Sequence, residues 1–200
     1  MKAKSKTSSA SRSQKESRQP SQSMGGSGYG IMESQLSKLF EDQLRDIYWA
    51  EKALTNALTK MAKKATSRDL VDVIENHLEE TRAQITKLDS VFESIGKKPR
   101  GKKCEAMEGL IKEGEEIISE TEEGAMRDAG IIAAAQKVEH YEIATYGTLR
   151  TYAQLLGVEE AANILEEILD EEKAADVKLT EVASEINLQA IEDAEEEEEE

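Results

Sequence analysis

The stretch LRDIYWAEKALTNAL, residues 44–58, places its large apolar side chains three or four positions apart, with one polar residue among them. The apolar members of this stripe are Leu44, Ile47, Leu54 and Leu58, and the polar member is Glu51. A repeat of about 3.6 residues is typical of an amphipathic helix whose apolar stripe faces the core. This stretch therefore predicts a long helix that carries one carboxylate inward.

Two later stretches show the same interruption. In one, Val138 and Leu149 belong to a stripe that contains Glu142, with Thr145 as the next inward position. In the other, the stripe that runs from Leu165 to Leu179 contains Glu172. The same spacing rule predicts two more helices, each with a carboxylate in its apolar face.

A fourth helix, predicted over residues 67–95, has His77 and Glu80 at the polar edge of its apolar face. Each of the four long helices thus points one carboxylate inward or nearly so. At about 1.5 Å per residue, Glu51, Glu80, Glu142 and Glu172 each lie roughly 20 Å from the turn that joins their helix to its neighbour. The four carboxylates are therefore expected at one level of the bundle.

The predicted helices cover residues 33–64, 67–95, 105–119, 127–156 and 159–186. Ser67 is a predicted N-cap, and Gly96 and Gly157 are predicted helix stops. Two antiparallel hairpins joined by a connection of about 30 residues favour an all-α, ferritin-like four-helix bundle, in which a long crossover with a short helix joins the second and third long helices. The alternative is a bundle with short loops throughout, or an irregular helical domain.

Composition agrees with an all-α protein, since 34% of the 200 residues are charged, 4% are aromatic and only two are proline. The net charge of −16 disfavours nucleic-acid binding by the body of the protein. The single cysteine excludes an internal disulfide framework and fits a reducing cytoplasm. No run of 18 apolar residues is present, so we expect no membrane-spanning segment and a cytoplasmic protein.

The two ends of the chain differ from the middle in composition. Residues 1–30 are basic and rich in serine, and are predicted to be a disordered tail that touches nucleic acid weakly at most. Residues 31–188 form the predicted bundle. Residues 189–200 end in a run of glutamates and are predicted to be a solvated acidic tail.

Four carboxylates at one level of an apolar core repel one another unless protons or cations neutralise them. Hard oxygen ligands with one imidazole suit iron, manganese or zinc, and two bridged ions would absorb the charge best. We therefore predict a two-metal site, most simply two Fe ions per chain, with Mn or Zn as the other candidates. An uncharged polar layer of protonated carboxyls is the alternative. The predicted ligands are Glu51, His77, Glu80, Glu139, Glu142, Glu172 and Asp176.

Other residues carry open interpretations. Tyr48, one turn before Glu51, is expected either to hydrogen-bond a ligand or take part in redox chemistry, or else to be a core aromatic. His140 is interpreted as a packing or dimer contact, and Cys104 as structural. Trp49 and Tyr141 are expected in a dimer interface or in the core.

Several long motifs resemble a known family. They are RDIYWAEKAL (45–54), HLEETRAQI (77–85), KKPRGKKCEAMEGLI (97–111), AAAQKVEHYEIATYGTLR (133–150) and LDEEKAAD (169–176). Over residues 33–186 the chain resembles the YciE/YciF family of ferritin-like bacterial stress-response proteins. The resemblance implies a ferritin-like fold, a di-iron site, a homodimer and a role in stress.

The ligand pattern departs from that of most di-iron bundles, which carry Glu-x-x-His on two helices. Here the order is reversed, as His77-x-x-Glu80, and residues 159–186 contain no histidine. The expected function is a di-metal stress protein that oxidises Fe(II) or consumes peroxide, with catalysis itself left open. A non-catalytic dimeric bundle that acts through partners is the alternative, and a nucleic-acid role for the basic tail is a third hypothesis.

Overall fold

Five helices make up the part of the chain that this computed structural model describes, residues 33–199, with side chains described to residue 192. They are α1 (Gln35–Lys64), α2 (Arg68–Ser94), α3 (Glu105–Glu120), α4 (Ala125–Leu155) and α5 (Glu159–Glu199). No strand occurs within these residues. The predicted basic tail, residues 1–30, lies outside the described residues.

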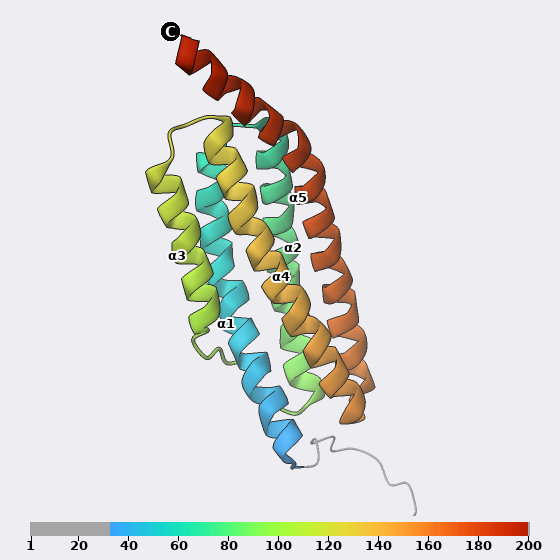
Figure 1. Ribbon diagram of the computed structural model, residues 1–200. Coiled ribbons are helices and arrows are strands. Elements are labelled where there is room, and N and C mark those ends of the chain that lie inside the picture. The colour runs from blue at the N-terminus through green and yellow to red at the C-terminus, as the bar shows by residue number, and fades with distance from the viewer. Residues whose placement is uncertain (1–32, 200) are drawn as a thin grey trace, which may run out of the picture.

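The four long helices form a bundle, and α3 packs on its outside against α1 and α4 (Figure 1). α1 and α2 are antiparallel neighbours, as are α4 and α5, and α2 also packs against α5. α3 carries the chain from the end of the bundle where α2 finishes to the end where α4 begins, so α2 and α4 run in the same direction (Figure 1). The all-α, ferritin-like arrangement with a long crossover is thereby confirmed.

Helix α2 begins after Ser67, and α2 and α4 end near Gly96 and Gly157, as the sequence predicts. Gly96 and Gly157 have φ of 70° and 72°, a left-handed conformation that glycine adopts without steric cost. At the end of α2, Lys97 N–H donates to the carbonyl of Phe92 at 2.9 Å, which satisfies a carbonyl that the helix leaves open. Ser67 caps the start of α2 by accepting a hydrogen bond from the backbone of Leu70.

The turn between α1 and α2 is held by a buried carboxylate from α4. Asp128 is 1% exposed, and it accepts hydrogen bonds from Thr66 N at 2.8 Å and Ser67 N at 2.6 Å. Backbone N–H groups at a helix start have no partner within the helix, and an ionised acceptor satisfies them strongly. This contact fixes one hairpin of the bundle to the other at the end where α4 begins.

The last helix is longer than predicted. α5 continues past the expected end at Ile186 to Glu199 and extends beyond the rest of the bundle (Figure 1). Glutamate is a good helix former, so a helix can continue through an acidic run after its packing partners end. No helix within residues 33–199 is long and apolar enough to cross a membrane.

Candidate metal centre

Five acidic and imidazole side chains gather inside the bundle. Glu51 on α1, His77 on α2, Glu139 and Glu142 on α4, and Glu172 on α5 are each at most 5% exposed. Their neighbours along each helix are apolar core residues, so the packing that forms the bundle also carries these polar groups inward. Helix geometry places Glu139 and Glu142 on one face of α4, one turn apart.

Four of these residues already lie at near-coordinating separations. One ligand atom from each of His77, Glu139, Glu142 and Glu172 can be chosen so that all four lie within 4.8 Å of one another. Ligands around a single ion at bond lengths of about 2.1 Å are at most about 4.2 Å apart. Side-chain shifts of under about an ångström would therefore close this group around a cation.

His77 lies between the buried glutamates and the partly exposed Glu80. Its Nε2 atom is 3.2 Å from Glu139 Oε1 and 4.0 Å from Glu172 Oε2, whereas its Nδ1 atom faces Glu80 Oε2 at 3.6 Å. The His77 backbone carbonyl accepts a hydrogen bond from the Thr81 hydroxyl at 2.9 Å. The imidazole thus presents one nitrogen to the buried glutamates and the other to the rim.

Glu51 is held by a tyrosine that the sequence analysis did not select. The Tyr146 hydroxyl donates to Glu51 Oε1, and both side chains are fully buried. The predicted inward position on this part of α4 was Thr145, which is wrong, because the stripe advances four residues from Glu142 to Tyr146 and Thr145 is only partly buried. A spacing of three and then four, from Glu139 through Glu142 to Tyr146, was the available signal.

Most oxygen and nitrogen atoms in this cluster have no hydrogen-bond partner among the described residues. They include both nitrogens of His77, both oxygens of Glu142 and of Glu172, and one oxygen each of Glu51 and Glu139. Buried polar atoms in folded proteins are almost always satisfied, and each exception calls for an explanation. Hard oxygen donors with one imidazole are the donor set that iron, manganese and zinc accept. The residues present therefore fit a divalent metal.

Burial and mutual repulsion shift the protonation of the cluster. Burial, with the charge of Glu172, raises the pKa of Glu51 to about 8. Burial likewise raises the pKa of Glu139 to about 8, and burial and the charges of Glu51 and Glu172 raise the pKa of Glu142 well above its ordinary range. Without a cation, the centre therefore retains protons at neutral pH.

The pKa of His77 is also raised, which for an imidazole favours the charged form. Burial alone lowers the pKa of His77, but the nearby Glu80 carboxylate and the charges of Glu172 and Glu51 outweigh it and raise that pKa above its ordinary value. The same contact with His77 lowers the pKa of Glu80. The rim carboxylate is therefore the one that ionises most readily.

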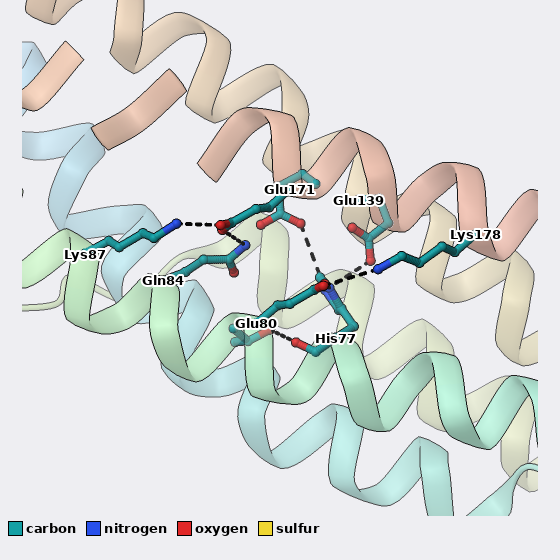
Figure 2. A network of polar contacts seen from close by, with 9 residues as sticks. His77, Glu80, Gln84, Lys87, Glu139, Glu171 and Lys178 are labelled. Carbon is teal, nitrogen blue, oxygen red and sulfur yellow. Dashed lines mark hydrogen bonds and ion pairs between the residues drawn. The ribbon is translucent and has the colours of Figure 1, made fainter. Parts of the chain in front are cut away.

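Glu80 lies at the rim of the cluster. Its side chain is 34% exposed, and its Oε1 atom accepts a hydrogen bond from Lys178 Nζ on α5 at 3.2 Å. Figure 2 shows Lys178 reaching across to Glu80, and Lys87 and Gln84 on α2 contacting Glu171 on α5 farther along the same two helices. The inward residue of α2 is thus His77, and Glu80 stands outside it.

Asp176 also lies at the edge. Its Oδ1 atom is 3.4 Å from Nε2 of His140, whose side chain is 70% exposed. The charge of Asp176 contributes to the raised pKa of Glu139, so the carboxylate lies near the cluster without being inside it. His140 is a surface residue in this chain and packs into no core.

Of the two interpretations of Tyr48, the one as a core aromatic is confirmed, since its side chain is buried. Its hydroxyl donates to Asp89 Oδ1 at 2.7 Å, and its ring meets that of Phe92 edge to face at 5.4 Å. The hydroxyl group of Tyr48 therefore faces α2.

Cys104 has a structural environment, as predicted. Its sulfur accepts a hydrogen bond from Met107 N at the start of α3 and lies 3.0 Å from the Tyr141 hydroxyl. Tyr141 in turn donates to Asp46 on α1 at 2.8 Å. This chain of contacts ties the crossover to α1 and α4. Trp49, also partly buried, packs against the core.

Comparison with known proteins gives the family. Residues 35–192 match the sequence profile described as domain of unknown function DUF892. The chain belongs to the DUF892 family. A curated relative, Protein YciF from Escherichia coli strain K12, is 52% identical over 149 residues, which are 74% of this chain and 90% of the relative. The expected YciE/YciF relationship is thus confirmed.

Solved structures agree with this assignment. The Escherichia coli stress protein YciF has 49% identity and a TM-score of 0.75, with 78% of this chain and 99% of that chain covered. YcfI from Rhodopseudomonas palustris, named as a candidate structural protein, has 48% identity and a TM-score of 0.72, with 74% and 94% covered. A protein from Xanthomonas campestris has 26% identity and a TM-score of 0.62, with 80% and 99% covered.

Proposed function

We propose that this stress-protein relative binds two divalent metal ions, most simply iron, in the centre of its bundle. The observation that carries the proposal is the set of buried carboxylate and imidazole atoms that have no hydrogen-bond partner among the described residues. Four buried glutamates carry four negative charges when ionised, and two divalent cations balance that charge. Glu51, His77, Glu139, Glu142 and Glu172 would hold the ions.

Glu80 and Asp176 complete the proposed ligand set from the rim. Glu80 is partly exposed and contacts His77, and Asp176 carries a buried oxygen with no hydrogen-bond partner among the described residues. Bound iron would supply one-electron chemistry toward dioxygen or peroxide. The apolar core around most of the cluster would limit the access of water, and Tyr146 would orient the Glu51 carboxylate through its hydrogen bond.

The proposal is tested by metal content. We expect about two iron or manganese ions per chain in protein purified without chelators or after anaerobic Fe(II) loading. Glu142→Gln keeps the shape of the side chain and removes its charge, so it should lose at least half of the bound metal. Glu181→Gln on the exposed face of α5 is the matched control. A wild-type protein that binds no metal after loading would refute the proposal.

Fe(II) oxidation is a separate question, tested by the absorbance of Fe(III) after mixing Fe(II) protein with dioxygen or peroxide. Oxidation that is faster in the wild type than in Glu142→Gln would support an oxidoreductase. Equal rates would leave a metal-binding protein without that activity.

A second function is favoured by the raised pKa values of the cluster. Glutamates that keep their protons can form an uncharged polar layer, and such a layer specifies how helices align rather than catalysing a reaction. This would make the chain a non-catalytic bundle that acts through partners. It predicts one melting temperature with and without added metal, whereas a metal centre predicts a clear rise on loading.

The homodimer and the cytoplasmic location remain proposals that rest on the family relationship and on the single cysteine. Light scattering of the purified chain tests the first, and fractionation of cells tests the second. Deletion of residues 1–30 tests whether any salt-dependent affinity for nucleic acid resides in the basic tail.

A further inference from the structure

At its α2–α5 edge the buried cluster meets a partly exposed carboxylate, Glu80. Glu51, Glu142 and Glu172 are at most 1% exposed, so a cation cannot reach them directly from solvent. Glu80 contacts one buried residue of the cluster and one exposed lysine. Its Oε2 atom is 3.6 Å from His77 Nδ1, and its Oε1 atom is 3.2 Å from Lys178 Nζ.

We propose that the ion pair of Glu80 and Lys178 is the entrance of the metal centre, where Glu80 receives an incoming divalent cation, releases Lys178 and turns inward with the cation toward His77. This inference rests on the proposed metal site. It assigns Lys178 the role of a positioning residue, because its ammonium group occupies the carboxylate before a metal arrives. The ammonium is a singly charged substitute for the divalent ion.

The ion pair borders a small cavity. The cavity has a volume of about 10 Å³, roughly the room that one water molecule needs, and it is lined by Glu80, Lys178, His77 and Glu139, together with apolar side chains such as Val73 and Leu179. The ion pair therefore borders the same cavity as two of the buried ligands. The proposed movement of Glu80 takes a rotation of its own side chain and small shifts of the side chains that line this cavity.

Lys178 is free to leave. Its side chain is 44% exposed, and a long lysine side chain can move its charge into water with little loss of interaction energy. A divalent cation interacts with a carboxylate more strongly than a single ammonium does at the same distance. Exchange of Lys178 for a divalent ion at Glu80 is thus favoured once the ion is close.

The chain contains a matched control in the same pair of helices. Lys87 on α2 contacts Glu171 on α5, so this second ion pair joins α2 to α5 with the charges exchanged between the helices (Figure 2). Neither Lys87 nor Glu171 lines the cavity beside His77. Lys178→Met and Lys87→Met each remove one lysine charge from this edge, but only the first frees Glu80.

The test is the rate at which the full-length, metal-free protein takes up Co²⁺, followed by stopped flow through the loss of a colorimetric metal indicator. Lys178→Met should take up Co²⁺ about tenfold faster than the wild type, because a repelling charge is removed and Glu80 becomes available. Lys87→Met should stay within about twofold of the wild type, since its pair lies outside the cavity. Glu80→Gln should slow uptake.

A double variant separates a specific exchange from general charge repulsion. If Lys178 acts through Glu80, Lys178→Met should accelerate uptake much less in the Glu80→Gln protein than in the wild type. Equal acceleration in both backgrounds would overturn the proposal, as would equal rates for Lys178→Met and Lys87→Met. Thermal melts of each variant show that it is folded before its rate is compared.

Failure of the entrance is distinguishable from failure of the metal site. If the wild type binds Co²⁺ at equilibrium but Lys178→Met and Lys87→Met have the wild-type rate, the site stands and the entrance is refuted. If the wild type binds no Co²⁺ at equilibrium, both proposals are refuted.

Discussion

Replacing Glu51 with glutamine should make the metal-free protein more stable at neutral pH and remove part of its pH dependence. Glu51 is fully buried, and burial raises its pKa to about 8 from an ordinary 4.5. The folded state therefore binds this proton more tightly than the unfolded state does. The resulting stability is fully present below about pH 4.5 and is lost as the pH rises toward about 8.

The size of this loss of stability follows from the difference between the ordinary and the raised pKa of Glu51. Each pH unit between the two pKa values changes the free energy of unfolding by about 1.4 kcal/mol for one group, so roughly 2.5 units between pH 4.5 and pH 7 correspond to about 3 kcal/mol. In a protein of this size, that is a decrease in melting temperature of about 6–12 °C. Glutamine keeps the shape of the side chain and cannot ionise. The melting temperature of Glu51→Gln should therefore depend less steeply on pH than that of the wild type.

The assay is thermal unfolding by circular dichroism from pH 5 to pH 8 in the presence of a chelator. Glu75→Gln, an exposed change on α2, is the control that alters charge without touching the cluster. A wild-type melting temperature that does not fall across this range would refute the reasoning. So would a Glu51→Gln protein with the same slope as Glu75→Gln. Loading the wild type with metal should reverse the trend, because cations replace the protons.

Three further changes test other contacts. Tyr146→Phe removes the hydroxyl that donates to Glu51 and should weaken metal binding about 10- to 100-fold, measured by competition with a chelator; unchanged affinity would show that Tyr146 does not orient the carboxylate. Asp128→Ala leaves two backbone N–H groups at the α1–α2 turn without their acceptor, and should reduce the free energy of unfolding, measured by urea denaturation, by about 3 kcal/mol. The surface change Glu181→Ala is the control and should cost less than about 0.5 kcal/mol. Gly157→Ala puts a side chain at a φ of 72° where nothing lies within 4 Å, so its cost of about 1 kcal/mol should come from the backbone alone; a larger loss would indicate a contact that this structure lacks.

The helices and their order could be predicted because each depends on local rules. Apolar spacing located the four long helices, and Gly96 and Gly157 ended two of them through a conformation that other residues adopt at a cost. Glu51, Glu142 and Glu172 were found because a charged residue in an apolar stripe is unusual. Their shared depth followed from the rise of a helix and the position of the turns.

The rest depends on contacts between helices, which spacing does not encode. His77 and Glu80 are about 60° apart around their helix, so both fit the same face, but only the packing of α5 decides which one points inward. Tyr146 looks like an ordinary core aromatic until Glu51 is placed opposite its hydroxyl. The acceptor of the Tyr48 hydroxyl, Asp89, lies 41 residues away along the chain, so spacing within one helix does not reveal this contact.

The position of the crossover has a consequence for how chains can assemble. α3 packs on α1 and α4, so it covers one side of the bundle, and the Glu80–Lys178 pair lies between α2 and α5 on the opposite side. A dimer that pairs two chains through their α2–α5 sides would seal both metal centres from the solvent. A dimer that pairs them through α3 would leave both centres open to exchange, so the geometry of assembly decides whether the two subunits load metal independently.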